Sequence, residues 1–165
     1  MEYLEKGFLL QNVKDISLQL QPCGVDLTIA KVFETEGIGS IDFDNSKRVL
    51  PDYKEVNMHE DHWLLDPGLY NITINEYVRL PNNIAALVLP RSSLMVCGAT
   101  ISSALWDPGY EGRGVLELEV KKKIRIYKDA RIGQMIFFKL EKETEPYNGI
   151  FRGEDVLKNG KRGKC

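Results

Sequence analysis

The side chains best suited to chemistry in this 165-residue sequence lie between Pro90 and Val120. Asp107 belongs to the turn sequence Asp-Pro-Gly-Tyr-Glu-Gly, where a carboxylate could hold a water or a metal. Tyr110 in the same turn offers a flat apolar face for a sugar or a ring. A surface turn, with the aspartate capping the backbone and the tyrosine packed on a sheet, accounts for the same residues. This segment alone leaves both interpretations open.

A second group of polar side chains, in Pro90-Arg91-Ser92-Ser93-Leu94, suits an anion. Arginine presents a planar fork of donors that matches phosphate oxygens, and serine hydroxyls with backbone N–H groups can complete such a site. A serine that caps a short helix after a strand over 85–89, beside an exposed arginine, also explains the pattern.

A β-hairpin must position Asp107 and Tyr110. Residues 99–106 are small or apolar and residues 115–120 alternate, so we expect two strands with Pro108-Gly109 at the tip. The rim of a hairpin offers unpaired backbone N–H and C=O groups, which can pair with the edge of a base.

Short alternating segments, separated by turn signals, make up most of the second half of the chain. We expect strands over the ranges 63–65, 69–74, 76–80, 84–89, 124–127 and 135–138. Many short strands of this kind indicate an all-β sandwich or jelly roll. Upstream, helical spacing predicts one or two helical turns within 2–16, and alternation predicts a strand over 16–20.

Composition limits the classes of protein. The length of 165 residues, the 43% of hydrophobic residues and the formal charge of −2 predict one soluble domain with a hydrophobic core. No apolar run approaches the roughly 20 residues of a membrane span, so we expect a cytoplasmic protein. The near-neutral charge argues against a nucleic-acid polymer as ligand, whereas a single nucleotide needs only a local basic pocket. His59 and His62 lack the H-E-x-x-H spacing of a zinc helix.

Taken together, four ordered motifs resemble the dUTPase and dCTP deaminase superfamily, most closely the dUTPases of archaeal type. The motifs are QPCGVDL, PRSSL with Gly98, WDPGYEGRG and ARIGQMIF, within about residues 20–153. The resemblance implies an all-β, distorted jelly-roll or β-clip subunit with at most one or two short helices. It also implies a domain over 1–146 and a flexible tail over 147–165 that closes over the active site.

For the activity, the resemblance implies hydrolysis of dUTP to dUMP and pyrophosphate. Asp107 would orient and deprotonate the attacking water, Mg²⁺ would bridge the triphosphate oxygens, and Asp26 would hold that ion through water. The implied substrate-binding residues are Arg91, Ser92, Ser93, Gly98, Tyr110, Gly112, Arg131, Gln134, Tyr147, Phe151 and Arg152. A homotrimer is implied, in which each site takes Arg91 and Ser92 from one chain and Asp107 and Tyr110 from a neighbour.

Other activities stay open at this point. Glu117, on the strand after the hairpin, stands where dCTP deaminases use a glutamate as proton carrier, and it equally fits an exposed acid in an alternating strand. Against deamination, Val96 stands where deaminases keep a second arginine, and Ala104 and Leu105 replace their T-A-H-R stretch. The alternatives are a dCTP deaminase, a bifunctional deaminase and dUTPase, and a nucleotide sensor without turnover.

Overall fold

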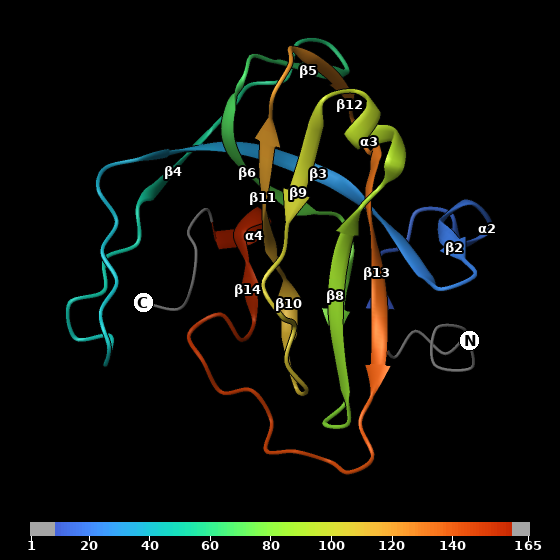
Figure 1. The fold of residues 1–165 in the computed structure, drawn as a ribbon, viewed down its shortest axis with the longest axis vertical. Coiled ribbons are helices and arrows are strands. Elements are labelled where there is room, and N and C mark those ends of the chain that lie inside the picture. The colour runs from blue at the N-terminus through green and yellow to red at the C-terminus, as the bar shows by residue number, and fades with distance from the viewer. Residues whose placement is uncertain (1–8, 160–165) are drawn as a thin grey trace.

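The computed structural model describes residues 9–159, and strands dominate it (Figure 1). The main sheet has the strand order β8-β13-β3-β6-β11-β9, and β2 and β4 also pair with β3. Its strands are β2 Leu20–Gln21, β3 Gly24–Glu36, β4 Asp52–Glu55, β6 Gly68–Ile74, β8 Ile84–Pro90, β9 Ala99–Ser102, β11 Val115–Val120 and β13 Arg131–Lys139. A bridge between Ala86 of β8 and Trp106, just beyond β9, joins the two ends of this order, so the sheet nearly closes into a barrel.

Two smaller sheets and three helical turns complete the described chain. One small sheet has the order β1-β7-β10-β14, and the other pairs β12 with β5. Their strands are β1 Leu10–Gln11, β5 His62–Leu65, β7 Tyr77–Arg79, β10 Glu111–Arg113, β12 Ile124–Tyr127 and β14 Glu154–Asp155. The helical turns are α2 Ile16–Gln19, α3 Ser92–Val96 and α4 Val156–Asn159. None of the helices within 9–159 has the length and apolar character needed to cross a membrane.

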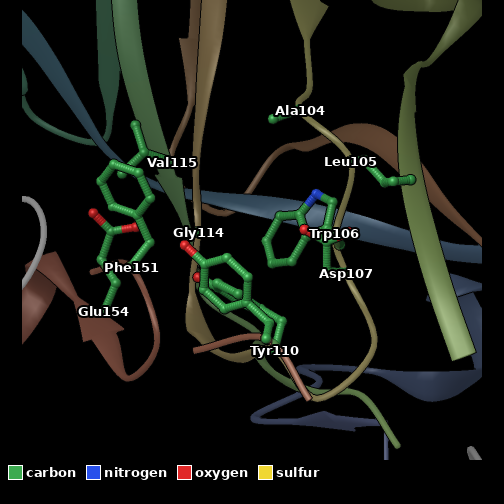
Figure 2. Close-up of a pocket in the computed structure, with 10 residues that line it drawn as sticks. Ala104, Leu105, Trp106, Asp107, Tyr110, Gly114, Val115, Phe151 and Glu154 are labelled. Atoms are coloured by element: carbon green, nitrogen blue, oxygen red, sulfur yellow. The ribbon is translucent and has the colours of Figure 1, made fainter. Parts of the chain in front are cut away.

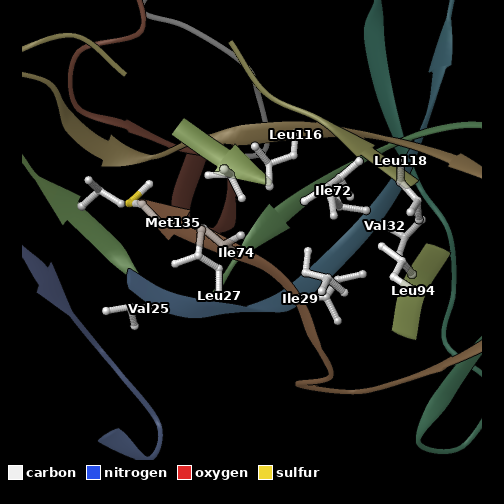
Figure 3. Packing of buried hydrophobic residues seen from close by; sticks show 14 of the residues in the cluster. Val25, Leu27, Ile29, Val32, Ile72, Ile74, Leu94, Leu116, Leu118 and Met135 are labelled. Carbon is white, nitrogen blue, oxygen red and sulfur yellow. The ribbon is translucent and has the colours of Figure 1, made fainter. Parts of the chain in front are cut away.

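The core lies inside the curved main sheet, where alternate residues of its strands point inward (Figure 3). On β11, Leu116 and Leu118 are buried while Glu117 between them is exposed, as strand periodicity requires. Leu27 on β3 and Met135 on β13 are fully buried against the same cluster. The expected all-β, jelly-roll-like fold is therefore confirmed, with three helical turns where at most two were expected.

The predicted hairpin around Asp107 is present and its second strand, β11, has the predicted bounds, but its first strand is shorter than predicted. β9 and β11 pair antiparallel, with Ser102 opposite Glu117, so pairing stops at Ser102 instead of continuing to Trp106. Trp106 instead bridges to Ala86 of β8, which draws the chain away from β11. The long connection that results contains β10, which joins the smaller sheet with β7 and β14.

The N-terminal predictions were wrong in detail. Ile16–Gln19 forms a helical turn where alternation predicted a strand, because the side chain of Asp15 accepts hydrogen bonds from the N–H groups of Ser17 and Leu18. Within the expected helical segment 2–16, Leu10–Gln11 forms a strand paired with β7, and residues 2–8 lie outside the described part.

The segment after Tyr147, for which a flexible tail was expected, returns to the molecule. Figure 1 shows the chain beyond β13 passing around one end of the fold before β14 and α4. β14 pairs parallel to β10, and residues 160–165 lie outside the described part. The boundary at 146 and the lid function stay predictions.

Candidate functional site

A cavity of about 250 Å³ opens beside Asp107 (Figure 2). We call it the Asp107 pocket. Its lining comes from the hairpin connection and from the C-terminal segment: Ala104, Leu105, Trp106, Asp107, Tyr110, Gly114, Val115, Tyr147, Phe151 and Glu154. Four residues proposed from the sequence, namely Asp107, Tyr110, Tyr147 and Phe151, therefore meet in one pocket.

Backbone hydrogen bonds hold the turn that carries Asp107. Leu80 donates its N–H to the carbonyl of Tyr110 at 2.9 Å and accepts the N–H of Gly109 at 3.1 Å. Within the turn, the N–H of Tyr110 donates to the carbonyl of Asp107 at 3.1 Å. On the other side, Tyr147 donates its N–H to the carbonyl of Pro108 at 2.8 Å. The turn is thus fixed between β7 and the C-terminal segment, so the position of Asp107 is defined by the fold.

Aromatic rings form the apolar part of the pocket. The ring of Tyr110 meets Trp106 edge-on at 5.0 Å between centroids and Tyr147 at 5.9 Å. The indole N–H of Trp106 donates to the hydroxyl of Ser103 at 3.0 Å. Gly114 makes this arrangement possible, because a Cβ there would lie 2.3 Å from the Trp106 ring. Rings locked in this way can present a flat wall to a sugar or base.

The C-terminal segment is anchored beside the pocket by β14. Gly112 of β10 pairs with Glu154, and Arg113 pairs with Asp155. Arg113 and Asp155 also form a largely buried ion pair, with Nη1 2.6 Å from Oδ2. Glu154 is buried and lines the pocket, and neither it nor Trp106 was among the site residues predicted from the sequence. The position of Trp106 beside Asp107 was an available signal, whereas a glutamate in a Gly- and Lys-rich tail offered none.

A second cluster, which we call the arginine cluster, gathers Asp26, Arg91, Arg131 and Gln134. The buried carboxylate of Asp26 lies 3.1 Å from Nε of Arg91 and 3.3 Å from Nη1 of Arg131, and both contacts use Oδ2. Gln134 lies directly opposite Asp26 in the pairing of β13 with β3, so the two side chains share one face of the sheet. Burial raises the pKa of the Asp26 carboxyl, and the positive charges of Arg91 and Arg131 act against that rise.

The arginine cluster carries two guanidinium groups and one carboxylate, so it favours an anion. Ser92 and Ser93 follow Arg91 directly and are exposed, as a phosphate contact would require. Gly98 ends α3 with φ +86°, a backbone conformation that suits glycine, and its carbonyl accepts the N–H of Lys121 at 2.8 Å. β9 pairs only with β11 among the described strands, so its outer edge can offer backbone groups to a base.

The Asp107 pocket and the arginine cluster do not meet within one chain. Arg91 directly follows the extended β8, five residues beyond Ala86, and Ala86 is bridged to Trp106. At about 3.3 Å per residue, this puts Arg91 about 16 Å from the position of Trp106. Asp107 continues from Trp106 away from Arg91, because the bridge is antiparallel. Within one chain, the Asp107 pocket and the arginine cluster are therefore two separate groups of candidate residues.

Glu117 and Arg152 lie outside both groups. The side chain of Glu117 is exposed on β11, opposite Asn71 and Ser102. Arg152 lies near Glu111, whose pKa is lowered mainly by a hydrogen bond from Arg79 and, to a smaller extent, by the charge of Arg152.

Comparisons with known proteins give the class to which this fold and site belong. The model of the dCTP deaminase-like family matches residues 3–140. A solved structure, the 2'-deoxycytidine 5'-triphosphate deaminase from Agrobacterium tumefaciens, matches with a TM-score of 0.62 at 24% identity and shares the fold. The match covers 82% of this chain and 45% of that longer one. The chain therefore belongs to the dCTP deaminase-like family.

Two archaeal proteins match this chain over most of its length. A Methanosarcina acetivorans protein named "Probable deoxyuridine 5'-triphosphate nucleotidohydrolase" is 44% identical over 152 residues, covering 90% of this chain and 89% of its own. The "Deoxyuridine 5'-triphosphate nucleotidohydrolase" of Methanocaldococcus jannaschii is 44% identical over 137 residues, covering 82% and 88%. The resemblance to the dUTPase and dCTP deaminase superfamily that the motifs indicated is confirmed.

Proposed function

We propose that the protein hydrolyses dUTP to dUMP and pyrophosphate, limiting uracil in DNA and supplying dUMP. The observation that carries this proposal is the Asp107 pocket, in which a carboxylate stands beside a wall of aromatic rings. The names of the archaeal relatives support the same substrate. The free nucleotide would be the partner, not a nucleic-acid polymer or a membrane, and the site of action would be the cytoplasm.

In the proposed reaction, Asp107 accepts a proton from a water as that water attacks the α-phosphorus. The bond from the α-phosphorus to the oxygen that bridges to the β-phosphorus breaks, and pyrophosphate leaves with the bonding electron pair. Arg91, Arg131 and Gln134, with the hydroxyls of Ser92 and Ser93, would bind the phosphate oxygens, where positive charge offsets the charge that accumulates. A positioned carboxylate is sufficient for the proton transfer.

The pocket would select the nucleoside by shape and hydrogen bonding. Tyr110 would stack under the deoxyribose and leave no room for a 2'-hydroxyl, and Gly112 would let the backbone approach. Backbone groups of β9 and Gly98 would read the uracil edge and reject cytosine, whose donor pattern is reversed. Phe151 and Arg152 in the C-terminal segment would cover the base and touch phosphate, and Tyr147 would close the pocket wall.

Mg²⁺ would enter largely bound to the triphosphate. No group of three or more His, Cys, Asp or Glu side chains within 9–159 could hold a metal ion by itself. Mg²⁺ commonly keeps several waters and takes oxygens from substrate phosphates, so an outer-sphere contact to Asp26 would be made only through Oδ1, because Arg91 and Arg131 both contact Oδ2. Asp26 would hold a water of the hydrated ion, and the ion would supply charge neutralisation.

The two halves of the site would be completed between subunits of a homotrimer. In this arrangement, Arg91 and Ser92 come from one chain and Asp107 and Tyr110 from a neighbour. The separation of about 16 Å or more along β8 supports it, because one nucleotide must touch both groups.

The test is a product assay with the Asp107→Asn variant as comparison. Wild-type protein with magnesium and dUTP should release dUMP and pyrophosphate, and Asp107→Asn should lower kcat by about 100-fold or more. A protein that binds dUTP without turnover would be the nucleotide sensor and would refute the proposal.

Deamination of dCTP is a second candidate, favoured by the exposed Glu117 on β11. The same assay run with dCTP distinguishes it. Formation of dUTP or dUMP from dCTP, lost in Glu117→Gln, would show a deaminase or a bifunctional enzyme.

A further inference from the structure

We propose that Gln19 and Glu76 are positioning residues that hold Asp26, and with it Arg91 and Arg131, in the geometry that binds the substrate's phosphates. The proposal rests on the proposed function, because it assigns phosphate binding to the arginine cluster. Neither residue touches the nucleotide in that scheme, so each would act through Asp26 and α2.

Glu76 is a fully buried carboxyl group in the connection between β6 and β7. Its Oε1 accepts hydrogen bonds from Nε2 of Gln19 and from the hydroxyl of Thr28, each at 2.7 Å. Its Oε2 accepts the backbone N–H of Thr28 at 3.0 Å. All three donors are neutral, and burying a carboxyl among neutral groups is costly. An apolar residue in this space would leave the three donors without this acceptor, so the carboxyl is held here by the hydrogen bonds that it accepts.

Gln19 connects Glu76 to the arginine cluster. Besides donating to Glu76, its Nε2 donates to the backbone carbonyl of Asp26 at 2.8 Å. Its Oε1 accepts the backbone N–H groups of Lys14 and Asp15 at 2.9 and 3.0 Å. One buried amide thus fixes the peptide of Asp26 and the chain that leads into α2.

Arg131 depends on both of the elements that Gln19 holds. Its Nη1 donates to the carbonyl of Leu18 in α2 at 2.5 Å and lies 3.3 Å from Oδ2 of Asp26. Arg91 contacts the same carboxylate oxygen. A shift of α2 or of the Asp26 peptide would therefore move the anchor of both guanidinium groups. Binding geometry is sensitive to displacements of this kind, on the order of 1 Å.

The charged groups around Glu76 are separated from it by neutral amides. Asn75 donates to the hydroxyl of Thr28 at 3.0 Å and to Asp129 at 2.9 Å, and Lys14 pairs with Asp129. Asp26 lies beyond Gln19. An exchange of glutamate and glutamine at positions 19 and 76 therefore changes the donor pattern without breaking a direct ion pair of Glu76.

The experiment compares Glu76→Gln with the exchanged variant Gln19→Glu/Glu76→Gln in the full chain. In Glu76→Gln, the new NH₂ group must face either the NH₂ group of Gln19 or the backbone N–H of Thr28, so the variant loses one hydrogen bond and should lower both stability and phosphate affinity. In the exchanged variant, Gln at position 76 can donate to Glu at position 19, which restores that contact. An ionised Glu at position 19 cannot donate to the carbonyl of Asp26, so the link to the arginine cluster stays broken.

We expect the exchanged variant to recover part of the thermal stability that Glu76→Gln loses, but to bind inorganic pyrophosphate roughly tenfold more weakly than wild type by titration calorimetry. With dUTP as substrate, KM should rise by a similar factor while kcat changes little. Gln11→Glu, which makes the same change at an exposed position of β1, should alter neither quantity.

Recovery of stability together with wild-type pyrophosphate affinity would overturn the proposal and leave Gln19 and Glu76 as purely structural. If the exchanged variant does not recover stability, the pyrophosphate affinity of Gln19→Ala tests the proposal instead. This variant removes the donor to the carbonyl of Asp26 and leaves the hydrogen bonds from Thr28 to Glu76 in place. Unchanged affinity in folded Gln19→Ala would then overturn the proposal. Wild-type protein that binds pyrophosphate but does not hydrolyse dUTP would refute the proposed function and leave this comparison intact.

Discussion

At the scale of single residues, the buried carboxyl of Glu76 should make the free energy of unfolding depend on pH. Burial raises the pKa of its carboxyl above the ordinary value, although hydrogen bonds from Thr28 and Gln19 oppose the rise. Between the ordinary and the raised pKa, the folded protein holds a proton that the unfolded chain releases. The free energy of unfolding should therefore fall as pH rises through that window.

Glu76→Gln should remove this part of the pH dependence, measured as the slope of Tm against pH from the acidic range to neutrality. Glu111→Gln is the matched comparison, because a hydrogen bond from Arg79 lowers the pKa of Glu111. The stabilisation from Glu111 is lost as pH falls, so that variant should change the slope in the opposite sense. A wild-type slope in Glu76→Gln would show that its carboxyl does not titrate differently on folding.

Residues in motifs could be predicted from the sequence, and residues in buried networks could not. The motifs placed Asp26, Arg91 and Arg131 among the functional candidates, and the structure brings these three together. Glu76, by contrast, begins an alternating segment that is typical of a half-exposed strand. Its burial comes from contacts with Thr28 and Gln19, which are distant in sequence, so no local pattern could indicate it.

At the scale of elements, the wall of the Asp107 pocket depends on a close approach between a strand and a ring. Gly114→Ala would place a Cβ 2.3 Å from the Trp106 ring. We expect the free energy of unfolding to fall by about 1–3 kcal/mol in urea denaturation, with a raised KM for dUTP. Gly68→Ala is the control, since its Cβ would meet nothing nearer than 3.5 Å. Equal stability of the two variants would contradict the packing argument.

The docking of β14 depends on the ion pair between Arg113 and Asp155. Asp155→Ala leaves a largely buried guanidinium without this partner, a change that costs about 3 kcal/mol or more. Amide hydrogen exchange in residues 147–157 should then be about 100-fold faster, with the main sheet unchanged. Glu145→Ala, an exposed position just before this segment, serves as the control. Unchanged exchange would show that other contacts hold the segment.

Strand periodicity predicted most elements, and competing contacts explain the exceptions. The alternating stretch after Asp15 became α2 because a side-chain cap satisfied its first N–H groups. The first hairpin strand ended at Ser102 because Trp106 found a backbone partner on β8. β14 formed because β10 offered it an edge, which composition alone does not reveal.

At the scale of the whole molecule, the described chain displays surfaces that suit assembly. Ile38, Ile41 and Phe43, between β3 and β4, are at least nine-tenths exposed. Two backbone hydrogen bonds between Ser40 and Val49 join the two sides of this connection, which we call the β3–β4 arm. Large apolar side chains on an ordered arm are typical of interaction surfaces. They are consistent with the proposed homotrimer.

The decisive prediction concerns that division. Arg91→Ala and Asp107→Asn chains should each be nearly inactive, since each lacks one half of every site. In a trimer that draws Arg91 and Asp107 from different chains, random mixing should leave about a quarter of the sites with both groups. Co-expressing the two variants with different tags and measuring pyrophosphate release from dUTP should therefore recover about that fraction of wild-type activity.

Two differently tagged copies of Asp107→Asn, mixed in the same way, should stay inactive because every site still lacks its carboxylate. A mixture of Arg91→Ala and Asp107→Asn that also stays inactive, although both tags purify together, would place Arg91 and Asp107 of each site in one chain. The chain would then have to bend to bring them together across the length of β8, which its pairing with β13 along seven residues resists. Recovery in the mixed trimer is the outcome that the geometry favours.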